Sequence, residues 1–130
     1  MIPMHKERRQ VKRYNIELDI DIVLEDGTIL PVLTHDISLN GIQFICDSQI
    51  ANEIEPRGLQ SHSLDRIRVK VITRFPTDET EKFYASCQVI TARRLSQEEY
   101  LLGLEFTDFE KSSGKNLQNY IKKLALEELG

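Results

Sequence analysis

The chain has 130 residues, of which 40% are hydrophobic and 29% charged, and its formal net charge is −4. This size and composition are typical of one globular domain with a single core. The acidic balance argues against a general nucleic-acid binder, which usually presents a basic face over the whole domain.

A polar, basic segment, residues 1–13, begins the chain. Its stretch HKERRQVKR contains five Lys or Arg residues against one Glu. The segment has no hydrophobic periodicity, so we expect a flexible arm that does not pack stably on the core. A local basic cluster in an acidic protein suits a compact anionic ligand better than a long polyanion.

The sequence also predicts where the protein is located. The first residues lack the apolar stretch of a signal peptide, and no apolar run approaches the roughly 20 residues that a membrane-spanning helix needs. We therefore expect a cytoplasmic protein without membrane insertion, whose cysteines stay reduced. Cys46 and Cys87 each lie in an apolar run, which favours two buried free thiols over a disulfide.

The region from residue 14 to residue 106 has the pattern of an all-β domain. Apolar residues alternate with polar ones from Tyr14 to Leu24, and a period of two over this length predicts a half-buried strand. The dipeptide Asp26-Gly27 then predicts a hairpin turn. In chain order, the six expected strands are residues 14–24, 28–35, 41–46, 64–73, 83–93 and 100–106.

The connections between these strands contain turn-forming or charged residues. They are a polar corner at 36–41, a loop at 47–63, a charged hairpin loop at 74–82 and a short turn at 96–99. The period then changes to helical spacing at Leu117, Tyr120, Ile121 and Leu124, which predicts a C-terminal helix over about 112–128, capped by Ser112 or Ser113. Six short strands and one helix predict a small closed barrel or a sandwich.

The first of two polar motifs lies in the arm, where Arg9 and Arg13 have the spacing RxxxR and Arg8 lies beside them. A guanidinium group is planar and always charged. It pairs with phosphate oxygens and with the O6/N7 edge of guanine, and it stacks on aromatic faces. Such an arm can hold a purine base and a phosphate together. Taken alone, however, this spacing more often marks a solvated basic terminus.

The second motif is DISLNG at residues 36–41, with the spacing DxSxxG. Asp, Ser and Asn form turns, and Gly41 can supply a positive φ, so a well-made β-corner is slightly favoured for the motif alone. The same groups can also face a ligand. The Asp36 carboxylate can accept from N1–H and N2–H₂ of guanine, the Ser38 hydroxyl can bond phosphate or sugar, and Gly41 allows close approach of the backbone.

The two motifs in this order, about 23 residues apart with one strand hairpin between them, resemble the PilZ family. Members of that family bind cyclic di-GMP through an RxxxR arm and a following D/NxSxxG motif. Both motifs match here without a departure, and the closing strand LLGLEF also looks similar. The resemblance covers nearly the whole chain.

The resemblance implies a six-stranded antiparallel barrel with a C-terminal helix, formed by residues 14–130, and a ligand-binding arm at 1–13. In the arm, Arg9 and Arg13 are implied to contact guanine and phosphate, with Arg8 as an additional basic contact. In the corner, Asp36 and Ser38 are implied to contact a guanine edge. The corner itself is implied to be shaped by Asn40 and Gly41.

The implied function is that of a bacterial, non-enzymatic receptor for cyclic di-GMP without a cofactor. The ligand would order the arm over the barrel mouth and create a surface for a protein partner in motility, secretion or exopolysaccharide machinery. One alternative is a PilZ-like adaptor that binds no nucleotide, although such adaptors typically lack the arginine arm. A barrel that binds single-stranded nucleic acid would need more exposed aromatics. His5, His35 and His62 lack metal-ligand spacing, and no nucleophile–base pair can be named.

Overall fold

The computed structural model describes residues 11–59, 64 and 67–130. Within these residues the strands and helices alternate along the chain in an order close to the expected one. In chain order they are β1 Tyr14–Asn15, β2 Asp19–Val23, β3 Ile29–Ile37, β4 Gly41–Asp47, α2 Ser48–Ile54, β5 Arg68–Phe75, β6 Asp78–Arg94, β7 Glu99–Phe109 and α3 Ser113–Leu129.

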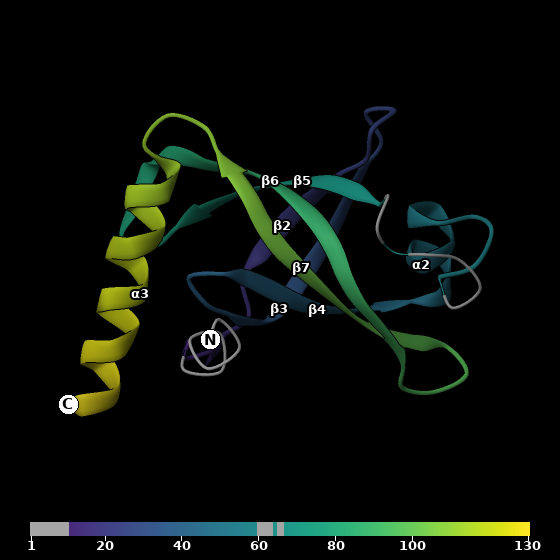
Figure 1. Ribbon diagram of the computed structural model, residues 1–130. Coiled ribbons are helices and arrows are strands. Elements are labelled where there is room, and N and C mark those ends of the chain that lie inside the picture. Colours follow the sequence, from purple (N-terminus) through teal and green to yellow (C-terminus); the bar gives the residue numbers. More distant parts are fainter. Residues whose placement is uncertain (1–10, 60–63, 65–66) are drawn as a thin grey trace, which may run out of the picture.

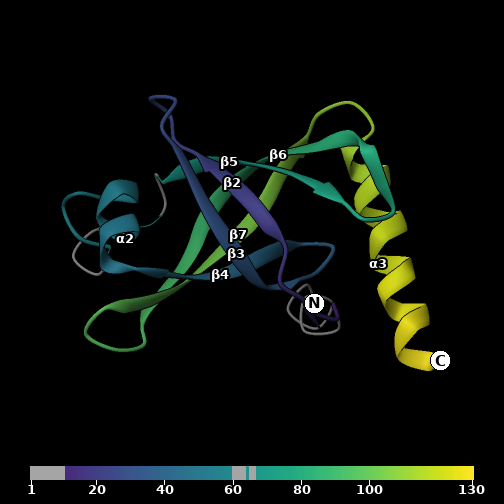
Figure 2. The same ribbon diagram turned by 180° about the vertical axis from the view of Figure 1, so that it is seen from behind.

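Six of these strands close into an antiparallel barrel. Hydrogen-bonded neighbours follow the order β3-β2-β5-β6-β7-β4, and β4 then pairs with β3 to complete the ring. β1 has two residues and pairs with β3 beside the ring. The barrel expected from the sequence is confirmed, and the sandwich alternative is wrong. Figure 1 shows α3 at one end of the barrel and α2 at the opposite end, and the reverse view in Figure 2 agrees.

The core follows from the period of two in the strands. Along β3 and β5 buried and exposed residues alternate, so apolar side chains such as Leu30, Val32, Val69 and Val71 point into the barrel. The larger aromatic side chains gather at the α3 end, where the rings of Phe75 and Phe83 lie 4.8 Å apart. Aromatic packing therefore fills the core at this end of the barrel.

The C-terminal helix is confirmed and packs by its predicted apolar stripe. Leu117, Tyr120, Ile121 and Leu124 are all buried, and the Tyr120 ring stacks on Phe75 with centroids 4.8 Å apart. The expected side-chain cap is wrong. Ser112 occupies the N-cap position but makes no cap hydrogen bond, because its hydroxyl donates to Glu81 on β6 instead.

Two expected loops are partly regular structure. The segment 47–63 contains α2, whose N-cap Asp47 accepts a 2.9 Å hydrogen bond from the amide of Ile50. Ile50, Ala51 and Ile54 pack against the core from one face of this helix. Seven residues, however, are too few for an apolar period to stand out in the sequence. In the segment 74–82 only residues 76–77 are a turn, and the rest extends β5 and β6 as a hairpin. The charged side chains of this hairpin are mostly exposed, so they are compatible with strand structure.

The expected first strand, 14–24, is broken between β1 and β2. Residues 16–18 leave the β3 ladder at the point where β3 also changes register against β4, between Thr34 and Asp36. The alternation of apolar residues continues through this break, since Ile16 and Leu18 still pack against the core. Periodicity alone could therefore not locate it.

Pro31 lies in the middle of β3, where a residue without an N–H would normally interrupt a ladder. The amide of Thr34 donates to the carbonyl of Leu18, so the even-numbered residues of β3 bond toward β2. Pro31 therefore points its nitrogen the other way. On that side β3 pairs with β4 only over residues 34–37. The proline thus removes no bond from the ladder.

The two cysteines are free and buried, as expected. Burial raises the pKa of both thiols to about 12. Among the described residues, neither helix combines the length and apolar character needed to cross a membrane.

Candidate functional site

The corner between β3 and β4 lies at the end of the barrel that carries α3 (Figure 1). Ser38 is fully buried there, and its hydroxyl oxygen accepts hydrogen bonds from the amides of Asn40 (3.0 Å) and Gly41 (3.2 Å). The Ser38 amide in turn donates to the Gly41 carbonyl at 2.9 Å. Ser38 therefore holds the corner in shape from within.

Gly41 is required for a reason other than the expected one. Its φ is not positive, unlike those of Gly27 and Gly58. It begins β4 opposite Glu105 of β7, and a Cβ built on it would lie 1.9 Å from the carbonyl oxygen of Leu104. The glycine thus allows close approach of a neighbouring strand. The expectation of a left-handed turn residue is wrong.

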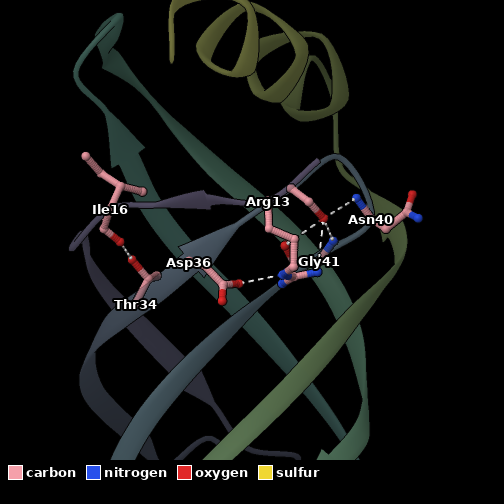
Figure 3. A network of polar contacts seen from close by, with 7 residues as sticks. Arg13, Ile16, Thr34, Asp36, Asn40 and Gly41 are labelled. Atoms are coloured by element: carbon pink, nitrogen blue, oxygen red, sulfur yellow. Dashed lines mark hydrogen bonds and ion pairs between the residues drawn. The ribbon is translucent and has the colours of Figure 1, made fainter. Parts of the chain in front are cut away.

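Arg13 reaches this corner from the N-terminal segment. β1 pairs Tyr14 with Ile37 and Asn15 with Asp36, a register that brings Arg13 alongside Ser38. Its Nε donates to Asp36 Oδ1 at 2.6 Å and its Nη1 to Ser38 Oγ at 3.3 Å. The two sequence motifs, 23 residues apart, therefore meet in one cluster, as Figure 3 shows.

The Asp36 carboxylate is buried, with its side chain only 7% exposed, whereas the Arg13 side chain is 39% exposed. A buried carboxylate requires a charged or hydrogen-bonding partner, and Arg13 supplies one. Among the described residues, Asp36 Oδ2 accepts no hydrogen bond, and it is not sealed from solvent. Donors that approach from the mouth of the barrel can therefore still bond to it.

A contact that the sequence did not predict joins the arm to α3. Lys12 Nζ bonds Glu128 Oε1 in the last turn of the helix at 2.5 Å and lies 5.4 Å from the centre of the Tyr14 ring. The hydrogen bond and negative charge of Glu128 raise the pKa of Lys12. Because both side chains are largely exposed, the contact is weak, but it places α3 next to the arm.

Of the predicted site residues, the structure brings together Arg13, Asp36, Ser38, Asn40 and Gly41. Asn40 contributes through its backbone, since its carbonyl accepts from the amide of Phe106 at 2.8 Å while its side chain is exposed. Arg8 and Arg9 lie outside the described residues. Among the described residues, no three His, Cys, Asp or Glu side chains gather in a way that could hold a metal ion.

One buried polar residue next to the cluster was missed in the sequence. Thr34 lies two positions before Asp36 on the same inward face of β3, and its hydroxyl bonds the broken segment 16–18. The signal was present, because extending the alternation of Asp36 and Ser38 backwards by one step leads to Thr34.

Comparison with known proteins gives a family match and a set of similar folds. The model of one family, the PilZ domain, matches residues 7–123. No curated protein matches the chain.

Among solved structures, an inhibitor of motility from Bacillus subtilis (MotI/DgrA) is 21% identical, with a TM-score of 0.67 over 99% of this chain. The chain spans 57% of the length of that protein. The PilZ domain of YcgR from Escherichia coli, solved with cyclic di-GMP, is 18% identical, with a TM-score of 0.63, covering 93% of this chain and 94% of that one. PlzA of Borreliella burgdorferi, in complex with cyclic di-GMP, is 13% identical, with a TM-score of 0.61, covering 93% of this chain and 53% of that one. At these identities the likeness concerns the fold.

Proposed function

Because the chain belongs to the PilZ domain family, we propose that it is a receptor for cyclic di-GMP and has no catalytic activity of its own. The observation that carries this proposal is the cluster of Arg13, Asp36 and Ser38. It joins the two motifs across 23 positions and leaves polar atoms unused.

The unused atoms suit a guanine nucleotide. Guanidinium carries five N–H donors, of which Arg13 uses one on Nε and one on Nη1 among the described residues. The remaining donors can take phosphate oxygens or the O6/N7 edge of guanine. Asp36 Oδ2 can accept from N1–H and N2–H₂ of the same base, which adenine does not offer.

The arm supplies the rest of the proposed site. Arg9 and, as a weaker contact, Arg8 would bind a second purine face or phosphate, while Asn40 and Gly41 shape the corner beneath them. Lys12 and Arg13 already bond Glu128 and Asp36, so the proposed ordering concerns the part of the arm before them. Ordering one residue of backbone costs roughly 1–2 kcal/mol, so that part needs charged contacts to settle. The ligand would provide them, and residues 1–13 would then cover the mouth of the barrel formed by residues 14–130.

A titration of the purified protein with cyclic di-GMP tests the proposal, with GTP and cyclic di-AMP as controls. Saturable binding of cyclic di-GMP alone is expected. An absence of binding would contradict the receptor function and leave the adaptor role, in which the barrel contacts proteins without a nucleotide.

Amide exchange with and without the ligand tests the ordering of the arm separately. Protection is expected to increase from Arg8 to Arg13, and most of all before Lys12, because Lys12 and Arg13 already make side-chain contacts. The strands β2 and β5 should change little. An arm that is already protected without ligand, or stays unprotected at saturation, would contradict the switch but not the ligand.

The ordered arm would present its new surface to a protein partner in motility, secretion or exopolysaccharide machinery, in the bacterial cytoplasm. The similarity in fold to an inhibitor of motility supports a partner of this kind.

A further inference from the structure

Three polar side chains follow one another at every second position along the inner face of β3 and the corner that ends it. Thr34, Asp36 and Ser38 are 2%, 5% and 0% exposed, respectively. Asp36 and Ser38 both bond Arg13, which lies in the segment before β2. Thr34 belongs to the same face and bonds the same segment a few residues later.

Thr34 closes the gap between β1 and β2. Its hydroxyl donates to the carbonyl of Ile16 at 2.5 Å and accepts from the amide of Leu18 at 2.9 Å. Its own amide donates to the carbonyl of Leu18 at 3.0 Å. Residues 16–18 are outside any strand, and the hydroxyl satisfies two of their backbone groups, the Ile16 carbonyl and the Leu18 amide.

The position of Arg13 depends on this gap. Between Arg13 and the break lie only the two residues of β1, and a two-residue ladder gives little resistance to slipping or detaching. Thr34 holds the segment immediately after that ladder. The register that brings Arg13 to Asp36 and Ser38 is therefore anchored at its far end by the Thr34 hydroxyl.

We propose that Thr34 is a positioning residue of the ligand site, which fixes the N-terminal segment so that the Arg13 guanidinium meets Asp36 and Ser38. Thr34 itself need not touch the ligand. The inference rests on the proposed function, because its effect on affinity presupposes that Arg13 binds cyclic di-GMP.

Thr73 on β5 provides a matched control. It is also a buried threonine, and its hydroxyl donates to a carbonyl of the same N-terminal segment, that of Asp19, at 2.7 Å. Asp19, however, begins β2, which the ladder holds opposite β3 from Asp19 to Val23. Thr73 therefore has the chemistry of Thr34 without its place next to the break.

The experiment compares Thr34→Val, Thr34→Ser and Thr73→Val by titration with cyclic di-GMP and by the NMR signal of the Arg13 Nε–H in the free protein. Valine keeps the shape but removes the hydroxyl, and serine keeps the hydroxyl. Thr34→Val is expected to weaken binding about tenfold, the effect of one or two hydrogen bonds. It should also shift or remove the Arg13 Nε–H signal. Thr34→Ser and Thr73→Val should retain near-native affinity and the signal.

Two results would overturn the inference: native affinity and an unchanged Arg13 signal in Thr34→Val, or equal losses in Thr34→Val and Thr73→Val. If Thr34→Val does not fold, Thr34→Ala is compared with Thr34→Ser by the same readouts. If the wild-type protein does not bind cyclic di-GMP, the proposed function fails. The Arg13 signal in the free variants then still decides whether Thr34 positions Arg13.

Discussion

Two arginine–carboxylate pairs lie at opposite ends of the barrel, and they differ in how many of their polar atoms are already bonded. Arg13 and Asp36 meet at the corner between β3 and β4, whereas Glu55 and Arg57 directly follow α2. Figures 1 and 2 show α2 and α3 at opposite ends of the barrel. In both pairs the carboxylate is 7% exposed. Burial of the acid therefore does not distinguish them.

The bonds of the pairs do distinguish them. Glu55 uses both oxygens, accepting from Arg57 Nη2 at 2.9 Å, from Nε at 3.0 Å and from the backbone amide at 3.1 Å. Among the described residues its charged partner is two positions away, so the chain forms this pair locally. Asp36 uses one oxygen, and its partner is 23 positions away.

This contrast suggests what marks a ligand site. A saturated local pair satisfies a buried charge and stabilises a turn. The Arg13–Asp36 pair joins distant segments, and among the described residues it still leaves an acceptor and several donors without a partner. A ligand could bond to those atoms. Matched variants at the two ends of the barrel test this interpretation.

The largest expected effect is that of Arg9→Ala/Arg13→Ala on affinity. A charged hydrogen bond contributes roughly 1.5–3 kcal/mol, so the loss of two arginines should weaken cyclic di-GMP binding by more than about a hundredfold. Arg57→Ala, at the other end, should bind within about twofold of the wild type. Calorimetric titration measures both. Near-native affinity in the double variant would sink the site assignment.

Asp36→Ala should follow, with a loss of about ten- to a hundredfold for cyclic di-GMP. Wild-type protein should bind cyclic di-AMP far more weakly than cyclic di-GMP, because adenine lacks the donors that Asp36 accepts. In Asp36→Ala the difference between the affinities for the two dinucleotides should be smaller. Glu55→Ala should keep the selectivity and lose about 1 kcal/mol of unfolding free energy. Comparable wild-type titration curves for the two dinucleotides would contradict the role of Asp36.

Glycine substitutions at the two ends of the barrel can be compared by their effect on the unfolding free energy. Gly41→Ala forces a Cβ against the Leu104 carbonyl, and overpacking of this kind costs roughly 1–3 kcal/mol. It should lower both the unfolding free energy and the affinity, because it displaces the corner. Gly58→Ala strains a residue with φ of 103°, so it should lower stability alone. Denaturant melts and titrations of the two variants test this. An unaltered affinity in Gly41→Ala would contradict the role of the β3–β4 corner in ligand binding.

The smallest expected difference between variants of the two ends concerns the cysteines, because both thiols lie in the core that the ends share. Burial raises the pKa of Cys46 and Cys87 from 9.0 to about 12, so at pH 8 about one thiol in 10⁴ is ionised in the folded protein. Alkylation should be very slow in every variant above that remains folded. The unfolded thiols ionise first, so the unfolding free energy should fall as the pH rises from about 9 to 12. Rapid labelling of the native wild-type protein at pH 8 would show that the thiols are accessible.

The barrel could be predicted because period two is strong in β2, β3 and β5, and the helix because four apolar residues in α3 share one face. Features that depend on three-dimensional contacts could not. α2 has seven residues, so its apolar face is too short to show a period in the sequence. The break at residues 16–18 keeps the alternation of a continuous strand and becomes visible only through the bonds to Thr34.

For the site, the sequence predicts which residues belong to the corner better than it predicts their contacts. The spacing of Asp36, Ser38 and Gly41 identified the corner, but the reason for Gly41 lies in β7, which is distant in sequence. That Arg13 pairs with Asp36 follows from the β1 register, which no local pattern encodes. The bond between Lys12 and Glu128 likewise depends on where α3 ends.

Pro31 has a consequence for how the protein behaves among copies of itself. β3 exposes Ile29 and Leu33 on either side of it, along a stretch where its outer edge is not paired with β4. An apolar strand edge of this kind is a template for aggregation, because a second chain can add its own strand there. The Pro31 nitrogen carries no hydrogen, so it cannot donate a hydrogen bond to an added strand at the centre of this edge. Pro31 thus disfavours strand addition at this edge of β3 and leaves the bonds between β3 and β2 intact.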